Sequence, residues 1–370
     1  MKKIKTFIFS ILLVQSTFGQ TGKDWPVFRG APNLTGITAN RLPGQPKLLW
    51  SYQAGDDLRS SPVSGSGRIV AGSMDGSVYC LDKNGQLQWE FKTGNGVEAP
   101  ALLHKGKVYI GDLDGSLYCL DLITGNKYWS YKADNQISGS PNIWESGERA
   151  RIVFGSYDFY LHCLDAHTGK LIWKYETDNF INGAAACYQG KAIFGGCDGF
   201  IHVVDIQTGK LAKQVDVATY IASSVAVSDN AAFLGDHDGK FSCIDLENET
   251  ITWTWTNEKA RLPFLASASV NQKVAVIGNE DKYTYCFNRT SGELVWRFNS
   301  GARINASPVI AGDRVLVANM RGDLYILDIS NGNVLWNYEL GSAITGNPAV
   351  VSGEQFFIAA SDGYIYCFGK

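Results

Sequence analysis

Short stretches in which apolar and polar residues alternate recur along the whole chain and are separated by glycine, aspartate and asparagine. In one of them, Trp129 and Tyr131 alternate with polar residues, which is the pattern of a half-buried β-strand. Shortly before it, Asp114-Gly115 follows another apolar stretch, and this dipeptide tolerates the positive φ of a tight hairpin turn. No stretch shows a sustained helical period. The pattern predicts an all-β protein.

Four strands in succession are expected around these residues, over residues 100–103, 107–111, 116–121 and 128–132. The same Asp-Gly turn occurs elsewhere at Asp75-Gly76, Asp198-Gly199, Asp238-Gly239 and Asp362-Gly363. The recurrence of the turn indicates that a four-stranded unit is repeated along the chain.

The distance from an aspartate to a following tryptophan gives the length of this repeat. Eight residues separate Asp121 from Trp129, and the same spacing separates Asp165 from Trp173, Asp245 from Trp253 and Asp328 from Trp336. Asn288 and Trp296 keep this spacing, Asp82 and Trp89 are one residue closer, and Asp205 is followed by Lys213 where tryptophan is expected. These anchors recur about every forty residues, which is typical of propeller blades.

The two ends of the chain each carry part of one blade. Residues 347–368 supply only three strands, whereas residues 48–52 contain Trp50 in the same Trp-x-Tyr pattern as the fourth strands. We expect this N-terminal strand to complete the C-terminal blade, because such pairing closes the ring and removes exposed sheet edges. The sequence thus predicts an eight-bladed β-propeller of four-stranded antiparallel blades over residues 44–370, preceded by a lead-in over residues 20–43.

Composition and the first residues bear on where the protein acts. The chain has 370 residues, 45% of them hydrophobic, and a net charge of −3 without a Lys/Arg cluster, which argues against a nucleic-acid partner. Three lysines precede the apolar run 7–14, and small residues follow at Thr17 and Gly19, as in a secretory signal peptide over residues 1–19. The run is too short to span a bilayer, and no cysteine lies near the expected cleavage site. We therefore expect an exported protein, periplasmic or secreted.

Two motifs resemble those of pyrroloquinoline quinone (PQQ) repeats. Residues 164–173, Leu-Asp-Ala-His-Thr-Gly-Lys-Leu-Ile-Trp, resemble the tryptophan-docking motif, and residues 120–129 and 327–336 are close copies. Residues 25–30, Trp-Pro-Val-Phe-Arg-Gly, resemble the lead-in of exported PQQ-repeat proteins. The resemblance covers roughly residues 24–370. It implies that a tryptophan from most blades packs between neighbouring blades, namely Trp50, Trp89, Trp129, Trp173, Trp253, Trp296 and Trp336.

This family contains enzymes and scaffolds, so the resemblance implies a fold more firmly than an activity. Its quinoprotein alcohol dehydrogenases have a vicinal cysteine pair, a tryptophan stacked on PQQ and insertions that build a calcium site, whereas the outer-membrane assembly lipoprotein BamB is not catalytic. The present chain has no Cys-Cys dipeptide and almost no insertions. We therefore favour a non-catalytic binding or assembly module, whose partner is a protein, a small molecule or a glycan.

The alternative is a PQQ-binding quinoprotein that oxidises an alcohol or a sugar, and a third hypothesis is a glycan-binding propeller that works beside polysaccharide-degrading enzymes. We expect a monomer in each case.

The cysteines and histidines follow the repeat. Six of the eight cysteines lie two residues before the anchor position, where Val203 and Ile326 occur in other blades, so we expect buried free thiols. Cys187 and Cys197 depart from this phase, and Cys187 is expected to lie opposite Ala192 rather than Cys197. His162 and His202 occupy a position that is tyrosine in other units, so we expect no metal site.

Candidate ligand-binding residues lie in the eight loops that enter the first strand of each blade. In propellers these loops face the central channel, and here a repeated aliphatic residue has variable polar neighbours, as a specific site requires. The candidates are Arg59, Glu98, Asn182, Arg261, Arg303, Asn305 and Thr345. Arginines among them are suited to clamping carboxylates such as those of PQQ.

Overall fold

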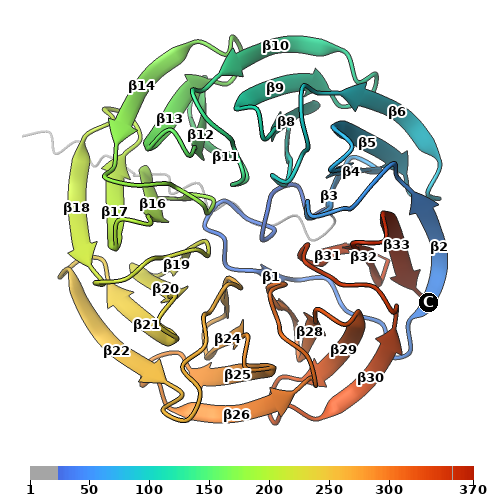
Figure 1. Ribbon diagram of the computed structural model, residues 1–370, viewed down its shortest axis with the longest axis vertical. Coiled ribbons are helices and arrows are strands. Elements are labelled where there is room, and N and C mark those ends of the chain that lie inside the picture. Colours follow the sequence, from blue (N-terminus) through green and yellow to red (C-terminus); the bar gives the residue numbers. More distant parts are fainter. Residues whose placement is uncertain (1–23, 352) are drawn as a thin grey trace, which may run out of the picture.

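The computed structural model describes residues 24–351 and 353–370, and in these residues every regular element is a β-strand. The expected signal peptide therefore lies outside the described residues. Eight antiparallel sheets are arranged around a central axis (Figure 1), which confirms the predicted eight-bladed propeller.

The blades follow one another in chain order, each running from the axis to the rim. The first four are β3 (Val63–Gly65) to β6 (Leu87–Lys92) with β4 (Arg68–Gly72) and β5 (Ser77–Asp82) between them; β7 (Leu102–His104), β8 (Lys107–Gly111), β9 (Ser116–Asp121) and β10 (Lys127–Lys132); β11 (Asn142–Ser146), β12 (Arg149–Gly155), β13 (Tyr160–Asp165) and β14 (Leu171–Glu176); and β15 (Ala186–Tyr188), β16 (Lys191–Gly195), β17 (Phe200–Asp205) and β18 (Leu211–Asp216).

The remaining blades have the same order of strands. They are β19 (Ala226–Ser228), β20 (Ala231–Gly235), β21 (Lys240–Asp245) and β22 (Thr250–Thr256); β23 (Ser269–Val270), β24 (Val274–Gly278), β25 (Tyr283–Asn288) and β26 (Leu294–Asn299); β27 (Val309–Ala311), β28 (Arg314–Ala318), β29 (Asp323–Asp328) and β30 (Val334–Glu339); and β31 (Ala349–Val351), β32 (Gln355–Ala359) and β33 (Tyr364–Gly369) with β2 (Lys47–Gln53).

The N-terminal strand closes the ring as predicted. β2 pairs antiparallel with β33, and Trp50 lies opposite Cys367 in the register. The indole N–H of Trp50 donates to the carbonyl of Lys83 in the first blade, at 3.1 Å. The eighth blade is thus built from both chain ends, and its N-terminal strand β2 fixes it to the first blade (Figure 1).

A β-bulge directs each docking side chain toward the next blade. The pairing of third and fourth strands shifts register in all eight blades, in the fourth blade between Val203 and Val204 and in the third between Cys163 and Leu164. The two apolar residues before Trp173 are left at the exposed rim, while its indole N–H donates to the carbonyl of Ile206 at 2.9 Å. A bulge re-aims side chains in this way because it adds one residue to one strand.

Six docked indoles pack on the glycine that turns the next blade, while that of Trp336 packs on Phe356 and Phe368. A Cβ atom at Gly169 would lie 2.5 Å from Cδ2 of Trp129, and similar distances hold at Gly125, Gly209, Gly292 and Gly332. The fourth blade is the exception, because Lys213 replaces the tryptophan and donates to the carbonyl of Glu247. In the blade that follows, Glu249 stands where the glycine is expected and keeps a φ of 58°. The glycine of the repeat is therefore required by the indole ring, beyond the turn geometry itself.

The anchoring aspartate of the motif caps the turn before the fourth strand. In the second blade, Asp121 accepts hydrogen bonds from the backbone of Ile123 and Thr124, and Asn288 accepts the equivalent bonds in the sixth. The hydroxyl of Tyr128 and the amide of Thr124 lower the pKa of Asp121 to about 2. The pKa of Asp328 is lowered by the Ser330 side chain, which donates to it. The charged form is thus the one that the folded turn favours.

We expect acid to destabilise the protein through these turns. Carboxylates whose pKa is depressed on folding stabilise the native state above the unfolded value of about 3.9, and this contribution is lost as the pH falls through the folded pKa. The midpoint of thermal unfolding should therefore decline below about pH 4. The Asp121→Asn variant, which copies the natural Asn288, should keep its stability at pH 7, and its unfolding midpoint should fall less steeply below about pH 4. An unchanged dependence of the midpoint on pH in this variant would contradict the explanation.

The cysteines are free, as predicted. Cys80, Cys119, Cys163, Cys243, Cys286 and Cys367 are buried in the blade cores, and Cys187 pairs with Ala192 in the register. Burial raises the pKa of the Cys80 thiol to about 12, and only Cys197 is partly exposed. We expect a thiol reagent to modify at most one cysteine in the native protein and all eight in denaturant. Rapid modification of several native thiols would contradict the burial of these positions.

Candidate functional site

The lead-in crosses the axis of the propeller and closes one end of its channel. The carbonyls of Pro26, Pro32 and Asn33 accept hydrogen bonds from the first strands of the second, fourth and fifth blades. Ile37 and Thr38 form β1 (Ile37–Thr38), which pairs parallel with β27 in the seventh blade. Figure 1 shows this segment passing through the middle of the ring. A ligand must therefore enter the channel from the opposite face.

The Trp-Pro-Val-Phe-Arg-Gly motif fixes the lead-in in the channel. Arg29 is buried, and its Nη2 atom donates to the carbonyl of Ala268 and to Oγ of Ser269. Burial lowers the pKa of Arg29 to about 9. The Trp25 ring packs so closely on Gly30, which has a φ of 80°, that a Cβ atom there would lie 2.7 Å from the ring. Phe28, which directly precedes Arg29, lines the cavity described below.

A cavity of about 480 Å³ occupies the channel above the lead-in. Its volume lies within the usual range of about 300–1,000 Å³ for small-molecule sites. Its wall contains two rings, to each of which every blade contributes one residue. The inner ring, just before the first strands, consists of Ser61, Pro100, Ser140, Ala184, Ser224, Ser267, Ser307 and Asn347. The outer ring, two residues earlier in each blade, consists of Arg59, Glu98, Ser138, Asn182, Ala222, Leu265, Asn305 and Thr345.

Hydrogen bonds of the inner ring connect successive blades. The amide of Ala184 donates to Oγ of Ser224 at 2.8 Å, and the amide of Ser224 donates to Oγ of Ser267 at 3.0 Å. The series continues through Ser307 and Asn347, whose amide donates to Oγ of Ser61 at 2.8 Å. These bonds hold the loops that carry the outer ring, and they reinforce the junction between the last and first blades. Sequence reasoning missed this ring, although serine recurs at the same phase at Ser61, Ser140, Ser224, Ser267 and Ser307.

The structure places five of the seven candidate residues in the cavity wall. Arg59, Glu98, Asn182, Asn305 and Thr345 all belong to the outer ring. Arg261 and Arg303 are exposed and are not among the residues that line the cavity, and Arg261 pairs with Glu258 at 2.7 Å. In the sixth blade, Phe264 occupies the buried aliphatic position of the loop, so Leu265 is the residue that reaches the cavity.

The electrostatic character of the cavity is nearly neutral. Arg59 is its one guanidinium and Glu98 its one carboxylate among the described lining residues. Nε of Arg59 lies 2.9 Å from Oδ2 of Asp57, and this hydrogen bond raises the pKa of Arg59. The guanidinium is therefore already paired with a protein carboxylate. The rest of the wall consists of hydroxyl, amide and small apolar groups, with Tyr157 and Phe28 as aromatic members.

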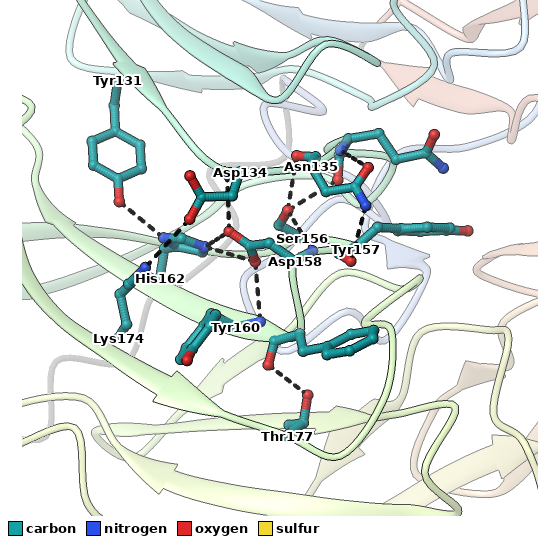
Figure 2. Close-up of polar contacts among 12 residues, drawn as sticks. Tyr131, Asp134, Asn135, Ser156, Tyr157, Asp158, Tyr160, His162, Lys174 and Thr177 are labelled. Carbon is teal, nitrogen blue, oxygen red and sulfur yellow. Dashed lines mark hydrogen bonds and ion pairs between the residues drawn. The ribbon is translucent and has the colours of Figure 1, made fainter.

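The histidines lie in the blades and not in the cavity wall. His162 is buried, with Nε2 donating to Oδ2 of Asp158 at 3.0 Å and Nδ1 lying 3.1 Å from the hydroxyl of Tyr131 (Figure 2). Burial acts to raise the pKa of Asp158, but the hydrogen bond and charge of His162 and the backbone amides of Asp134 and Tyr160 together lower it. His202 makes the same contacts with Asp198 and Tyr175. In other blades a tyrosine bonds directly to the turn aspartate, as Tyr79 does to Asp75 at 2.6 Å.

His162 and His202 thus take the place of the repeat tyrosine and are held by hydrogen bonds within the blades. Among residues 24–351 and 353–370, no group of three or more His, Cys, Asp and Glu side chains is arranged to hold a metal ion. A search of the same residues for a long apolar helix that could cross a membrane gave none.

One protein family matches nearly the whole propeller. The family described as outer membrane protein assembly factor BamB matches residues 43–143, 143–279 and 197–369. No curated protein matches the chain.

Solved structures resemble the fold at low sequence identity. BamB from Moraxella catarrhalis aligns with a TM-score of 0.71 at 17% identity, covering 88% of this chain and all of that one. A europium-containing methanol dehydrogenase aligns with a TM-score of 0.76 at 13% identity, covering 94% and 98% of the two chains. Quinohemoprotein alcohol dehydrogenase from Comamonas testosteroni aligns with a TM-score of 0.79 at 13% identity, covering 95% and 81%. At these identities the likeness concerns the fold alone.

Proposed function

Since the chain belongs to the family described as outer membrane protein assembly factor BamB, we propose that it is an exported, non-catalytic binding module that takes its ligand in the open mouth of the channel. The observation that carries this proposal is the cavity wall, in which one short loop from each of eight blades presents side chains of varied chemistry on a common frame. Variable side chains on a rigid scaffold are the arrangement of a specific binding site.

The chemistry of the wall supports binding over turnover. General acid–base catalysis uses groups that exchange protons near neutral pH, and the wall is dominated by serine, asparagine, threonine, glycine and alanine. Glu98 and Arg59 come from neighbouring blades, and Arg59 is engaged by Asp57. Hydroxyl and amide groups at these positions orient a ligand but do not activate it.

The alternative, a PQQ-dependent dehydrogenase, is favoured by the likeness to the two dehydrogenase structures. The residues of the cavity do not fit that cofactor well. PQQ carries carboxylates, and Arg59 is already paired, while Arg261 and Arg303 lie outside the wall. Docked tryptophans such as Trp173 are bonded to the neighbouring blade. The aromatic rings that line the cavity are those of Tyr157 and Phe28.

A redox assay on the purified chain separates the two functions. We expect no saturable change in quinone absorbance when PQQ is added with or without calcium, and no dye reduction with a panel of alcohols and sugars. Dye reduction that depends on PQQ and is lost in the Arg59→Ala variant would refute the non-catalytic proposal. Absence of both PQQ binding and dye reduction would support the non-catalytic binding module.

A further inference from the structure

Four polar atoms of the outer ring are buried and make no hydrogen bond within the described chain. They are Oγ of Ser138, Oδ1 of Asn182, Oδ1 of Asn305 and Oγ1 of Thr345, and all four residues line the cavity. A buried polar atom without a partner costs roughly 1–3 kcal/mol. Most buried polar groups in proteins are satisfied. These four atoms are covered as the side chains stand, but they belong to residues that line the cavity, so rotation of the side chains would present them to a ligand.

The identity of these groups limits the chemistry of that ligand. Amide oxygens accept hydrogen bonds, whereas the Ser138 and Thr345 hydroxyls both donate and accept. All four are neutral, and the two charged residues among the described lining residues, Arg59 and Glu98, come from adjacent blades. A neutral ligand with several hydroxyl groups satisfies donors and acceptors together, while an anionic ligand would have to be desolvated without a free counter-charge, because Arg59 is paired with Asp57.

An aromatic wall lies beside two of these groups. Tyr157 lines the cavity and stacks on Phe180 with ring centroids 4.8 Å apart, and Phe180 contacts Phe159 at 5.1 Å. Phe180 is 37% exposed and Phe159 is 40% exposed, although aromatic rings of this size are usually buried. These rings supply an apolar surface next to the polar groups of Ser138 and Asn182.

Hydrogen bonds hold this aromatic wall in place. The amide of Tyr157 donates to the carbonyl of Gln136, and Nδ2 of Asn135 donates to the carbonyl of Tyr157 at 3.3 Å. Oγ of Ser156 donates to the carbonyl of Asn135 at 2.9 Å. Figure 2 shows Tyr157 beside Asn135 and Ser156, on the turn that also carries Asp158. The ring is thus positioned before a ligand arrives, which reduces the entropy lost on binding.

Resting on the proposed binding function, we propose that the channel mouth binds a neutral carbohydrate, either a short oligosaccharide or the end of a longer glycan. A pyranose ring has an apolar face, which packs on Tyr157, and equatorial hydroxyls, which bond to Ser138, Asn182, Asn305 and Thr345. The lead-in closes the cavity below with Phe28, so the glycan enters end-on from the loop face.

The test measures binding of neutral gluco-, manno-, galacto- and xylo-oligosaccharides and of an oligouronate by titration calorimetry, using the full purified chain. We expect saturable binding of at least one neutral member. Tyr157→Ala and Asn305→Leu should each weaken it about tenfold or more, which is the loss of one buried contact of roughly 1.4 kcal/mol. Tyr128→Ala is the control, since Tyr128 is a tyrosine on the outer strand β10 and does not line the cavity.

Two further measurements separate a binding role from a structural one. Thr345→Val removes an unsatisfied hydroxyl at constant shape, so it should raise the unfolding midpoint of the free protein while weakening the glycan complex. Nδ2 of Asn182 lies 3.3 Å from Sγ of Cys197, so a bound glycan should slow alkylation of Cys197. A variant that lowers both stability and affinity would indicate a structural residue and overturn its assignment to the site.

The remaining outcomes distinguish the inference from the function on which it rests. Binding of the oligouronate alone, or binding that is unchanged in Tyr157→Ala and Asn305→Leu, would overturn the carbohydrate site but leave a binding module. Failure of every saccharide to bind or to protect Cys197 would likewise overturn the carbohydrate assignment. PQQ-dependent dye reduction in the assay described above would instead refute the proposed function.

Discussion

Deletion of residues 44–55 should lower the midpoint of thermal unfolding by roughly 10 °C or more, because the strand that closes the ring is lost. The deletion removes the whole of β2 and with it the Trp50 indole, whose ring lies 5.8 Å from Phe357 and whose N–H bonds to the first blade. It also leaves β33 as an open sheet edge. Calorimetry and size-exclusion chromatography would record the loss of stability and any edge-to-edge association.

A peptide of residues 44–55 added in trans provides the control for this deletion. If β2 acts as a closing strand, the peptide should pair with β33 and restore part of the midpoint. An unchanged midpoint in the deletion variant would contradict the closure. The inner-ring bond from the amide of Asn347 to Oγ of Ser61 would then have to carry the junction alone.

The Gly169→Ala variant should be less stable by about 3–4 kcal/mol, although it adds one methyl group. About 1–2 kcal/mol comes from placing a Cβ atom at a φ of 71°. The rest comes from moving the Trp129 ring, because the new atom would lie 2.5 Å from it. Chemical denaturation followed by tryptophan fluorescence would give the free energy of unfolding.

Gly147→Ala is the matched control for this substitution. Gly147 also has a positive φ, of 60°, but no atom lies within 4 Å of the Cβ position. It should cost only the backbone term of about 1–2 kcal/mol. Equal losses in the two variants would show that the turn conformation, and not the docked indole, requires glycine at position 169.

The architecture could be predicted from the sequence alone, because the same local signals recur from blade to blade. Alternating residues at Trp129 and Tyr131, Asp-Gly turns and the aspartate-to-tryptophan spacing each specify a local structure, and their agreement left only one arrangement for the strand around Trp50. The cysteine positions were predictable for the same reason, since Val203 and Ile326 reveal an apolar site.

Other features depended on contacts between blades, which no single repeat encodes. The bulge before each docking residue is invisible in an alternating pattern, and it is the bulge that turns Trp173 toward Ile206. The pairing of Lys213 with Glu249 likewise becomes meaningful only when the two residues are seen on adjacent blades, 3.8 Å apart.

The candidate site was partly accessible from sequence. The loops that enter the first strands could be aligned, so five outer-ring positions were named, but Arg303 precedes the buried Ile304 and is exposed while Asn305 follows it and lines the cavity. A strict two-residue alternation would place Arg303 and Asn305 on the same side, so the loop departs from a regular strand here. A loop alignment does not supply that direction.

The sequence by itself determined the fold, because the hydrophobic period, the turn residues and the repeat length are local properties that specify the same unit in successive blades. What only the tertiary structure decided is the character of the channel. The lead-in reaches across the first strands of distant blades, and the neutral wall with its four unpartnered polar atoms exists only where eight loops converge. Burial, direction and pairing of those side chains are set by residues far away in the chain.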